Sequence, residues 1–186
     1  KMKKIIIILL AFIGVVSCKK DAKTEKSAPE IEKETTAKTS DVKVSVDKEQ
    51  LLSTTIAYFK NCKETEVNRN DCRNSITKMI SEFYDISDFK NAQGDYVVYD
   101  SIQSIIKKSD AWVKLGKASN QKVLEKAQEA ANNGNATIAI DVSESYGQVA
   151  MIIPGKLTNS GSWKLKVPNT AALVNYDATK SFMNKS

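Results

Sequence analysis

The chain has 186 residues, of which 41% are hydrophobic and 27% charged, and its formal net charge is +6. This length and composition are typical of one soluble globular domain with additional segments, and they exclude a fibrous or wholly disordered protein. Lys1, Lys3 and Lys4 supply three of the positive charges, which leaves a surplus of +3 for the rest of the chain. Because that surplus is small and no run of Lys or Arg is interleaved with aromatic residues, we expect no nucleic-acid partner.

The N-terminal segment predicts export. Lysines precede an apolar run from Ile5 to Val16, which is shorter than the ~20 residues of a membrane-spanning helix but suits the core of a signal peptide. The run ends in Val15-Val16-Ser17-Cys18, which resembles the lipobox of bacterial lipoproteins. The resemblance implies that residues 1–17 are a signal peptide and that Cys18 is lipidated, anchoring the protein to the bacterial cell envelope at the outer membrane. The alternative is an ordinary secretory peptide in which Cys18 falls by chance.

A composition shift follows the cysteine. Residues 19–48 are rich in Lys, Glu, Asp, Thr, Ser and Ala and contain no aromatic residue. Such a segment buries too little apolar surface to offset the entropy of ordering, so we interpret residues 18–47 as the lipidated cysteine and a disordered tether. Within it, Val42, Val44 and Val46 alternate with polar residues, a pattern that predicts a short edge strand.

Helical periodicity dominates the first part of the globular domain, which we place at residues 48–186. Leu52, Ile56 and Phe59 predict a first helix, followed by a polar stretch at 61–71. A second helix, capped by Asn70 or Asp71, is predicted to carry Cys72 in its first turn. Its apolar face comprises Cys72, Ile76, Met79, Ile80 and Phe83.

Two more helices and a strand are expected before the sequence pattern changes. A short strand is predicted at 96–99, and Ile102, Ile105 and Ile106 indicate a short helix. Ser119 or Asn120 is expected to cap a helix that runs to Ala131 and stops at Gly134.

Beyond Gly134 the hydrophobic period becomes two, which is typical of strands. Strands are predicted at 137–142, 149–153, 163–167 and 171–176, and the continuously apolar run 149–153 indicates a central one. Since the turns between them are short, we expect antiparallel pairing. Helices followed by strands predict an α+β domain, with the N-terminal helices packed on a C-terminal antiparallel sheet.

Cys62 and Cys72 allow two interpretations. In an exported protein they are expected to form a disulfide that closes the polar loop between them. Alternatively, Cys72 is a nucleophile, because the unpaired N–H groups at a helix N-terminus stabilise a thiolate.

Three segments of the chain resemble the NlpC/P60 and CHAP families of papain-like peptidoglycan amidases and peptidases. They are Asp71-Cys72-Arg73-Asn74-Ser75 with its helix, residues 130–139, and Gly147-Gln148-Val149-Ala150-Met151. The resemblance implies a papain-like core with Cys72 at the nucleophile position and Gln148 at the position of the histidine base. It places a third, polar site residue within 159–169, and Tyr146, Trp112 and Trp163 are candidates for the substrate-binding walls.

The chain contains no histidine, and this shapes the functional prediction. An acyl-transfer cysteine enzyme needs a group that accepts and returns a proton, and glutamine does not titrate. We therefore expect a degenerate, lipid-anchored domain that binds peptidoglycan or peptide. The alternatives are an active Cys-dependent amidase with an unusual base, and a non-enzymatic structural or interaction lipoprotein with a Cys62–Cys72 disulfide. No cofactor and no metal site are indicated, because histidine is absent and the carboxylates form no cluster with ligand spacing.

Overall fold

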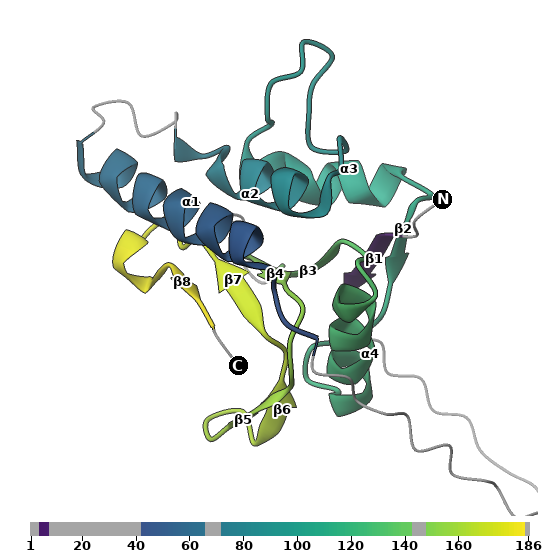
Figure 1. Ribbon diagram of the computed structural model, residues 1–186. Helices are drawn as coiled ribbons and strands as arrows, with labels where there is room; N and C mark the ends of the chain where they lie inside the picture. Colours follow the sequence, from purple (N-terminus) through teal and green to yellow (C-terminus); the bar gives the residue numbers. More distant parts are fainter. Residues whose placement is uncertain (1–3, 8–41, 66–71, 143–147, 185–186) are drawn as a thin grey trace, which may run out of the picture.

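A computed structural model describes residues 4–7, 42–65, 72–142 and 148–184 (Figure 1). The helices are α1 (Val46–Thr65), α2 (Ser75–Tyr84), α3 (Ile102–Lys108) and α4 (Gln121–Asn132), with short 3-10 turns η2 (Tyr99–Ser101) and η3 (Ala178–Lys180). The strands are β1 (Lys4–Ile7), β2 (Trp112–Lys114), β3 (Thr137–Ile140), β4 (Val149–Ile152), β5 (Thr158–Ser160), β6 (Leu165–Val167), β7 (Thr170–Ala172) and β8 (Phe182–Met183).

The main sheet has the strand order β2-β1-β3-β4-β7-β8, and β5 and β6 form a separate hairpin. The pairs from β3 through β8 are antiparallel, whereas β1 runs parallel to both β2 and β3. The α+β class is therefore confirmed, with a mixed rather than a purely antiparallel sheet. The apolar run at 149–153 does supply a central strand, because β4 lies between β3 and β7.

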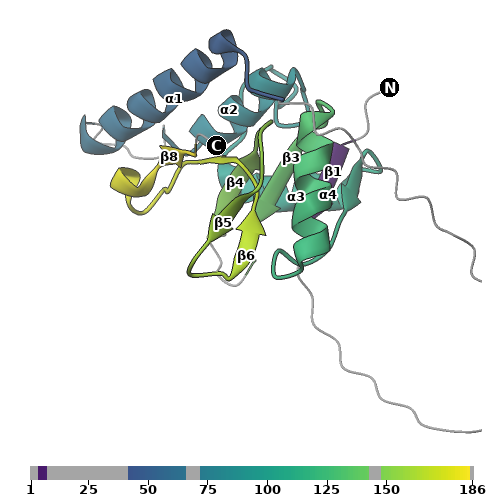
Figure 2. The ribbon, with the colours of Figure 1, turned by 60° about the horizontal axis from the view of Figure 1, so that its bottom comes forward.

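Helices cover both faces of the sheet, as the alternation of side chains along the strands shows. Met151 of β4 and Ile138 of β3 pack with α1, α2 and α3, while their neighbours Ile152 and Ala139 pack with α4. Since successive residues of a strand point to opposite faces, α4 lies on the opposite face from α1 and α2. Figures 1 and 2 show this layering, with the sheet between α4 and the α1–α2 pair.

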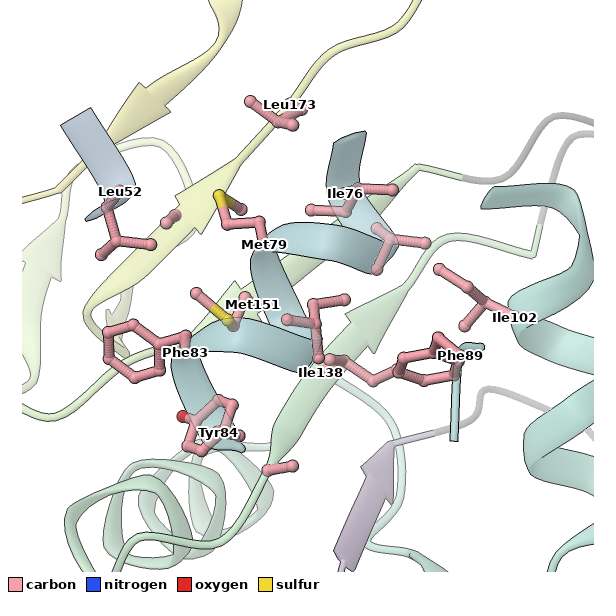
Figure 3. Packing of buried hydrophobic residues seen from close by; sticks show 14 of the residues in the cluster. Leu52, Ile76, Met79, Phe83, Tyr84, Phe89, Ile102, Ile138, Met151 and Leu173 are labelled. Atoms are coloured by element: carbon pink, nitrogen blue, oxygen red, sulfur yellow. The ribbon is translucent and has the colours of Figure 1, made fainter. Parts of the chain in front are cut away.

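The larger core is built around α2, whose sequence places apolar side chains at helical spacing (Figure 3). Met79, Ile80 and Phe83 are almost completely buried between the sheet and α1. The neighbouring Tyr84 donates its hydroxyl proton to the carbonyl oxygen of Ile152, so even the polar atom of this side chain is satisfied. This core fixes α2, and the turn that precedes it, against the sheet.

Most of the predicted helices are confirmed. Leu52, Ile56 and Phe59 are buried on α1, and the predicted short helix at 102–106 is α3. Asn120 caps α4, its side chain accepting a hydrogen bond from the backbone N–H of Lys122 at 3.0 Å. Gly134 ends this helix with a positive φ of 79°, which glycine adopts readily.

Several local predictions are wrong. Residues 96–99 form no strand, because Tyr96 makes only an isolated bridge with Lys90 and η2 begins at Tyr99. Val42 and Val44 lie in irregular chain and Val46 already begins α1, so the predicted edge strand is absent from this described segment. The predicted polar loop begins later than 61, since α1 continues to Thr65.

Cys72 does not lie in the first turn of α2 either, since that helix begins at Ser75 with Asn74 at the N-cap position. The cysteine occupies a short turn before the helix. The predicted caps, Asn70 and Asp71, are outside the described residues, as are Cys18 and most of the predicted tether. No helix in the described ranges is long and apolar enough to cross a membrane.

Strand β1 falls within the predicted signal peptide, although it occupies a position inside the sheet. Its Ile5 pairs with Val113 of β2 on one side and with Thr137 of β3 on the other. In the described part of the chain β2 pairs with no strand except β1. Cleavage before Cys18 would remove β1 and leave β2 without a ladder partner.

We therefore expect the amides of Val113 and Lys114 to exchange with solvent much faster in a mature chain that begins at Cys18 than in the full chain. The amides of Met151 and Ala150 provide the control, because the β3–β4 pairing does not involve β1. Hydrogen exchange read by mass spectrometry measures both segments in one experiment. Equal protection of β2 in the two chains would contradict the expectation and indicate that β2 pairs elsewhere after cleavage.

Candidate functional site

A cavity of about 420 Å³ lies where the C-terminal end of α1 and the turn before α2 meet one end of β4 and the segment that follows β7. Its apolar wall comes from Phe59, Ile76, Val149 and Leu173, and Cys72 also lines it. The polar side chains at its edge are those of Arg73, Tyr99, Gln148, Asn175 and Tyr176. Among these described residues that line it, none carries a carboxylate.

The cavity contains both positions that the sequence singled out. Cys72 comes from the turn before α2 and Gln148 from the residue that precedes β4, yet they line the same space. The backbone carbonyl of Gln148 accepts a hydrogen bond of 2.8 Å from the N–H of Asp141, which continues the β3–β4 pairing beyond the strands. The sheet therefore fixes the backbone of Gln148 relative to Cys72.

A disulfide joins Cys72 to Cys62, whose Cα atoms are 5.9 Å apart. Cys62 lies on the buried face of α1, near its C-terminal end, and both cysteines are almost fully buried. The bond ties the end of α1 to the turn before α2 and so forms part of the cavity wall. In this state Cys72 has no thiolate, and the thiolate is the nucleophilic form of cysteine.

Gln148 forms a polar pair with a residue that the sequence did not indicate. Its exposed side chain donates through Nε2 to the hydroxyl of Tyr176 at 2.7 Å. Tyr176 is 70% exposed, so this pair lies at the rim of the cavity rather than in its interior. The amide oxygen of Gln148 and the phenol proton of Tyr176 are groups that bind the backbone of a peptide.

The cavity edge also carries a cation, the guanidinium of Arg73, that is held in place by its neighbours. The guanidinium of Arg73 pairs with the carboxylate of Asp100 and lies 5.4 Å from the centre of the Tyr99 ring. The carbonyl of Arg73 also accepts from the N–H of Tyr99 at 3.0 Å. These contacts fix the turn that carries Cys72 against η2.

The Tyr99 hydroxyl is neutral at physiological pH. Burial raises the pKa of this phenol above its ordinary value, and a side-chain hydrogen bond with Asn175 acts in the opposite direction. Tyr99 is therefore a neutral hydrogen-bonding group and does not supply a base.

Residues 159–169, where a third polar site residue was predicted, do not line the cavity. Within 159–169, Asn169 is buried against α4, where its N–H donates to the side chain of Gln128 at 2.7 Å. Asn175 lines the cavity instead, and its Oδ1 accepts from the Nζ of Lys63 at 3.3 Å. Residues 159–169 lie away from the cavity because the sheet neighbour of β4 is β7, while β5 and β6 form a hairpin outside the main sheet.

The two tryptophans that were predicted to wall the site do not reach the cavity. Trp112 is buried against Phe89, with a ring-centre distance of 5.6 Å, and its indole N–H donates to Asp88. Trp163 is exposed in the β5–β6 connection, and neither tryptophan lines the cavity. Tyr146 is outside the described residues. Among the described residues, Tyr99 and Tyr176 are the tyrosines that line the cavity. No functional signal in the sequence indicated either of them, although Tyr176 ends the strand that was predicted at 171–176.

The described residues offer no machinery for proton transfer at Cys72. Gln148 does not titrate, the lining side chains include no carboxylate, and the whole chain lacks histidine. In the described ranges no group of three or more His, Cys, Asp or Glu side chains is arranged to hold a metal ion. The site is thus equipped for hydrogen bonding and apolar contact.

A comparison of the chain with models of known protein families finds no match. Comparisons with curated proteins and with solved structures also find none.

The disulfide predicts that Cys62 and Cys72 are protected from thiol reagents in the folded protein unless a reductant is present. A Cys62→Ala/Cys72→Ala double variant should lose about 3 kcal/mol of unfolding free energy, the chain-entropy value for a loop of this length. Thiol titration in denaturant and thermal unfolding measure the two quantities. Reactive thiols at these positions without a reductant would contradict the disulfide.

Proposed function

We propose that this protein is a lipid-anchored protein of the bacterial cell envelope, whose cavity binds peptide or the peptide part of peptidoglycan without cleaving it. The observation that carries the proposal is the shared cavity of Cys72 and Gln148, in which the cysteine is held in a disulfide. Cys72, at the nucleophile position of the proposed family, is thus blocked by the disulfide, and Gln148, at the base position, is an amide. The cavity that both residues line is still open to a ligand.

The lining of the cavity suits a short peptide. Phe59, Ile76 and Leu173 offer apolar contact to an aliphatic side chain, and ligand pockets are commonly apolar with a few directed polar groups. The side chains of Gln148 and Asn175 each provide both a donor and an acceptor, which complements the N–H and C=O of an amide. A ligand of this kind needs no group that titrates.

An exported location agrees with the disulfide, because such bonds persist in oxidising compartments and are rare in the cytosol. The lipobox-like Val15-Val16-Ser17-Cys18 supplies the anchor in this proposal. A papain-like core is part of the same proposal. Its support is the placement of a cysteine before α2, next to the residue that precedes a central antiparallel strand.

A structural or interaction lipoprotein is the second candidate, and the disulfide itself favours it. The bond is buried and links α1 to the turn before α2, which is sufficient reason for both cysteines without any ligand. An active Cys-dependent amidase is the third candidate. It requires reduction of the bond and a base that the described lining does not provide.

Binding of peptidoglycan-derived peptides tests the first candidate. Gln148→Ala should weaken binding about tenfold, since it removes a directed hydrogen-bonding group worth about 1–1.5 kcal/mol. Gln93→Ala is the matched control, because Gln93 is also exposed but lies in the loop around Gly94, away from the cavity lining. Isothermal titration calorimetry measures the affinities. Equal affinity of the wild type, Gln148→Ala and Gln93→Ala for the peptide would show that Gln148 at the cavity rim takes no part in peptide binding.

A double-mutant cycle with Tyr176→Phe sharpens the same experiment. The Gln148–Tyr176 hydrogen bond predicts that the two substitutions are not additive, because each removes the same pair. Losses in binding free energy that simply add would indicate that the two side chains act independently on the ligand.

Catalysis separates the binder from the amidase. Neither the oxidised nor the reduced protein should release products from peptidoglycan, whereas Gln148→His in the reduced protein restores a Cys–His pair and is expected to give measurable cleavage. Chromatography of released fragments measures the products, with Gln148→His/Cys72→Ala as the control. Cleavage by the wild-type protein that is lost in Cys72→Ala would contradict the non-catalytic proposal.

A further inference from the structure

The structure points to a second interaction surface on the β5–β6 hairpin, and we propose that this hairpin docks on an anionic lipid surface. This inference rests on the lipid anchor of the proposed function and concerns a part of the molecule away from the cavity. We call residues 156–167 the basic hairpin. It contains an exposed tryptophan with lysines beside it, which is the side-chain combination that favours the boundary between lipid headgroups and acyl chains.

The tip of the basic hairpin is a defined turn. Ser160 pairs with Leu165, so residues 161–164 form the connection between the strands. Lys164 adopts a left-handed backbone with φ of 53°, and its N–H donates to the carbonyl of Ser160 at 2.9 Å. The N–H of Trp163 donates to Oγ of Ser160 at 3.3 Å. The backbone on which the indole is carried is therefore fixed by the turn.

Trp163 is 57% exposed, although tryptophan is a residue that folded proteins normally cover. The chain's other tryptophan, Trp112, is buried in the core. An indole left at a hairpin tip costs solvation free energy in water and regains it where the ring meets an apolar layer while its N–H stays hydrated.

The charged side chains of the basic hairpin itself are all positive. The segment from Pro154 to Asn169 contains three lysines and no Asp or Glu. Lys164 and Lys166 are exposed on the hairpin itself. Glu125 of α4, the one carboxylate among the described residues that line the groove beside the hairpin, offsets part of this charge. The hairpin still has a positive surplus that complements anionic headgroups.

The basic hairpin is held rigidly to the rest of the domain. Gln121 donates through Nε2 to the carbonyl of Lys166 at 3.2 Å, and its Oε1 accepts from the N–H of Lys166 at 2.8 Å. These two bonds attach β6 to the first turn of α4. Figures 1 and 2 show the hairpin extending from the body beside α4, on a different side from α1 and α2. Docking through the hairpin would therefore orient the whole domain on the membrane.

Charge complementarity favours a lipid surface over a glycan as the occupant. A neutral sugar would use the indole face but gain nothing from Lys164 and Lys166, whereas a phosphate-bearing surface uses all three side chains. A lipid at Cys18 would also keep the hairpin close to such a surface, which raises its effective concentration.

The test uses the mature lipidated chain, which begins at Cys18, reconstituted into vesicles of phosphatidylglycerol and brominated phosphatidylcholine. Bromine atoms in the acyl chains should quench the fluorescence of the wild-type protein more strongly than that of Trp163→Phe, which retains only Trp112, the tryptophan that packs against Phe89. Lys164→Gln/Lys166→Gln should lower the equilibrium constant for docking of the hairpin about fivefold for each lysine removed, and quenching should fall with it. Lys107→Gln/Lys108→Gln on α3 removes the same charge from exposed positions elsewhere and should leave quenching unchanged.

Each outcome decides the proposal. Quenching that depends on Trp163, on both hairpin lysines and on phosphatidylglycerol supports it. Protein that floats with the vesicles but shows no Trp163 quenching overturns hairpin docking and leaves the anchor intact. Protein that does not float overturns the anchor and the docking together. A further outcome is that soluble peptidoglycan fragments reduce the quenching of Trp163 by acrylamide, while brominated lipid does not quench it. That result overturns the lipid surface as the occupant and favours a glycan.

Discussion

The Cys62–Cys72 disulfide is the constraint on which the rest of the site depends. It fixes the end of α1 to the turn before α2, and that turn supplies Cys72 and Arg73 to the cavity. The same bond removes the thiolate that a cysteine hydrolase would need. The bond that shapes the cavity wall therefore also leaves no free thiol at Cys72.

The sheet provides the other half of the site through ordinary packing. Met151 and Ile138 anchor β4 and β3 under α2, and the pairing that continues to Asp141 and Gln148 fixes the cavity rim. On the opposite face, Gln128 of α4 donates to the carbonyl of Ile153 and accepts from the N–H of Asn169. Both faces of β4 are thus secured, so Gln148 is presented by a rigid strand although its side chain is exposed.

Sequence periodicity was sufficient for the elements with long apolar faces. The positions of α1, α2, α3 and α4 followed from their spacing, and Asn120 and Gly134 marked the ends of α4 correctly. The prediction of a strand at 96–99 was wrong because the backbone of this segment forms its hydrogen bonds with a loop and a helix rather than with a strand. Val97 donates to Phe89 and accepts from the hydroxyl of Thr77, so α2 and a loop replace the expected strand partner.

The site was predictable only in part. Cys72 and Gln148 could be paired from motif order, but their common neighbours Asn175 and Tyr176 depend on which strand lies beside β4. Sequence order suggested the strand at 163–167, whereas the 3D arrangement uses β7. Long-range strand order is decided by the packing of the whole domain, and a local pattern does not encode it.

The central claim is that the oxidised protein binds peptide in the cavity beside the disulfide. Chemical-shift mapping by NMR with a peptidoglycan-derived peptide tests it most directly. We expect the largest shifts on Gln148, Asn175 and Tyr176 and on the backbone around Arg73, with Cys62 and Cys72 still bonded and the peptide intact. Shifts confined to other surfaces, or binding that requires reduction of the disulfide, would contradict it.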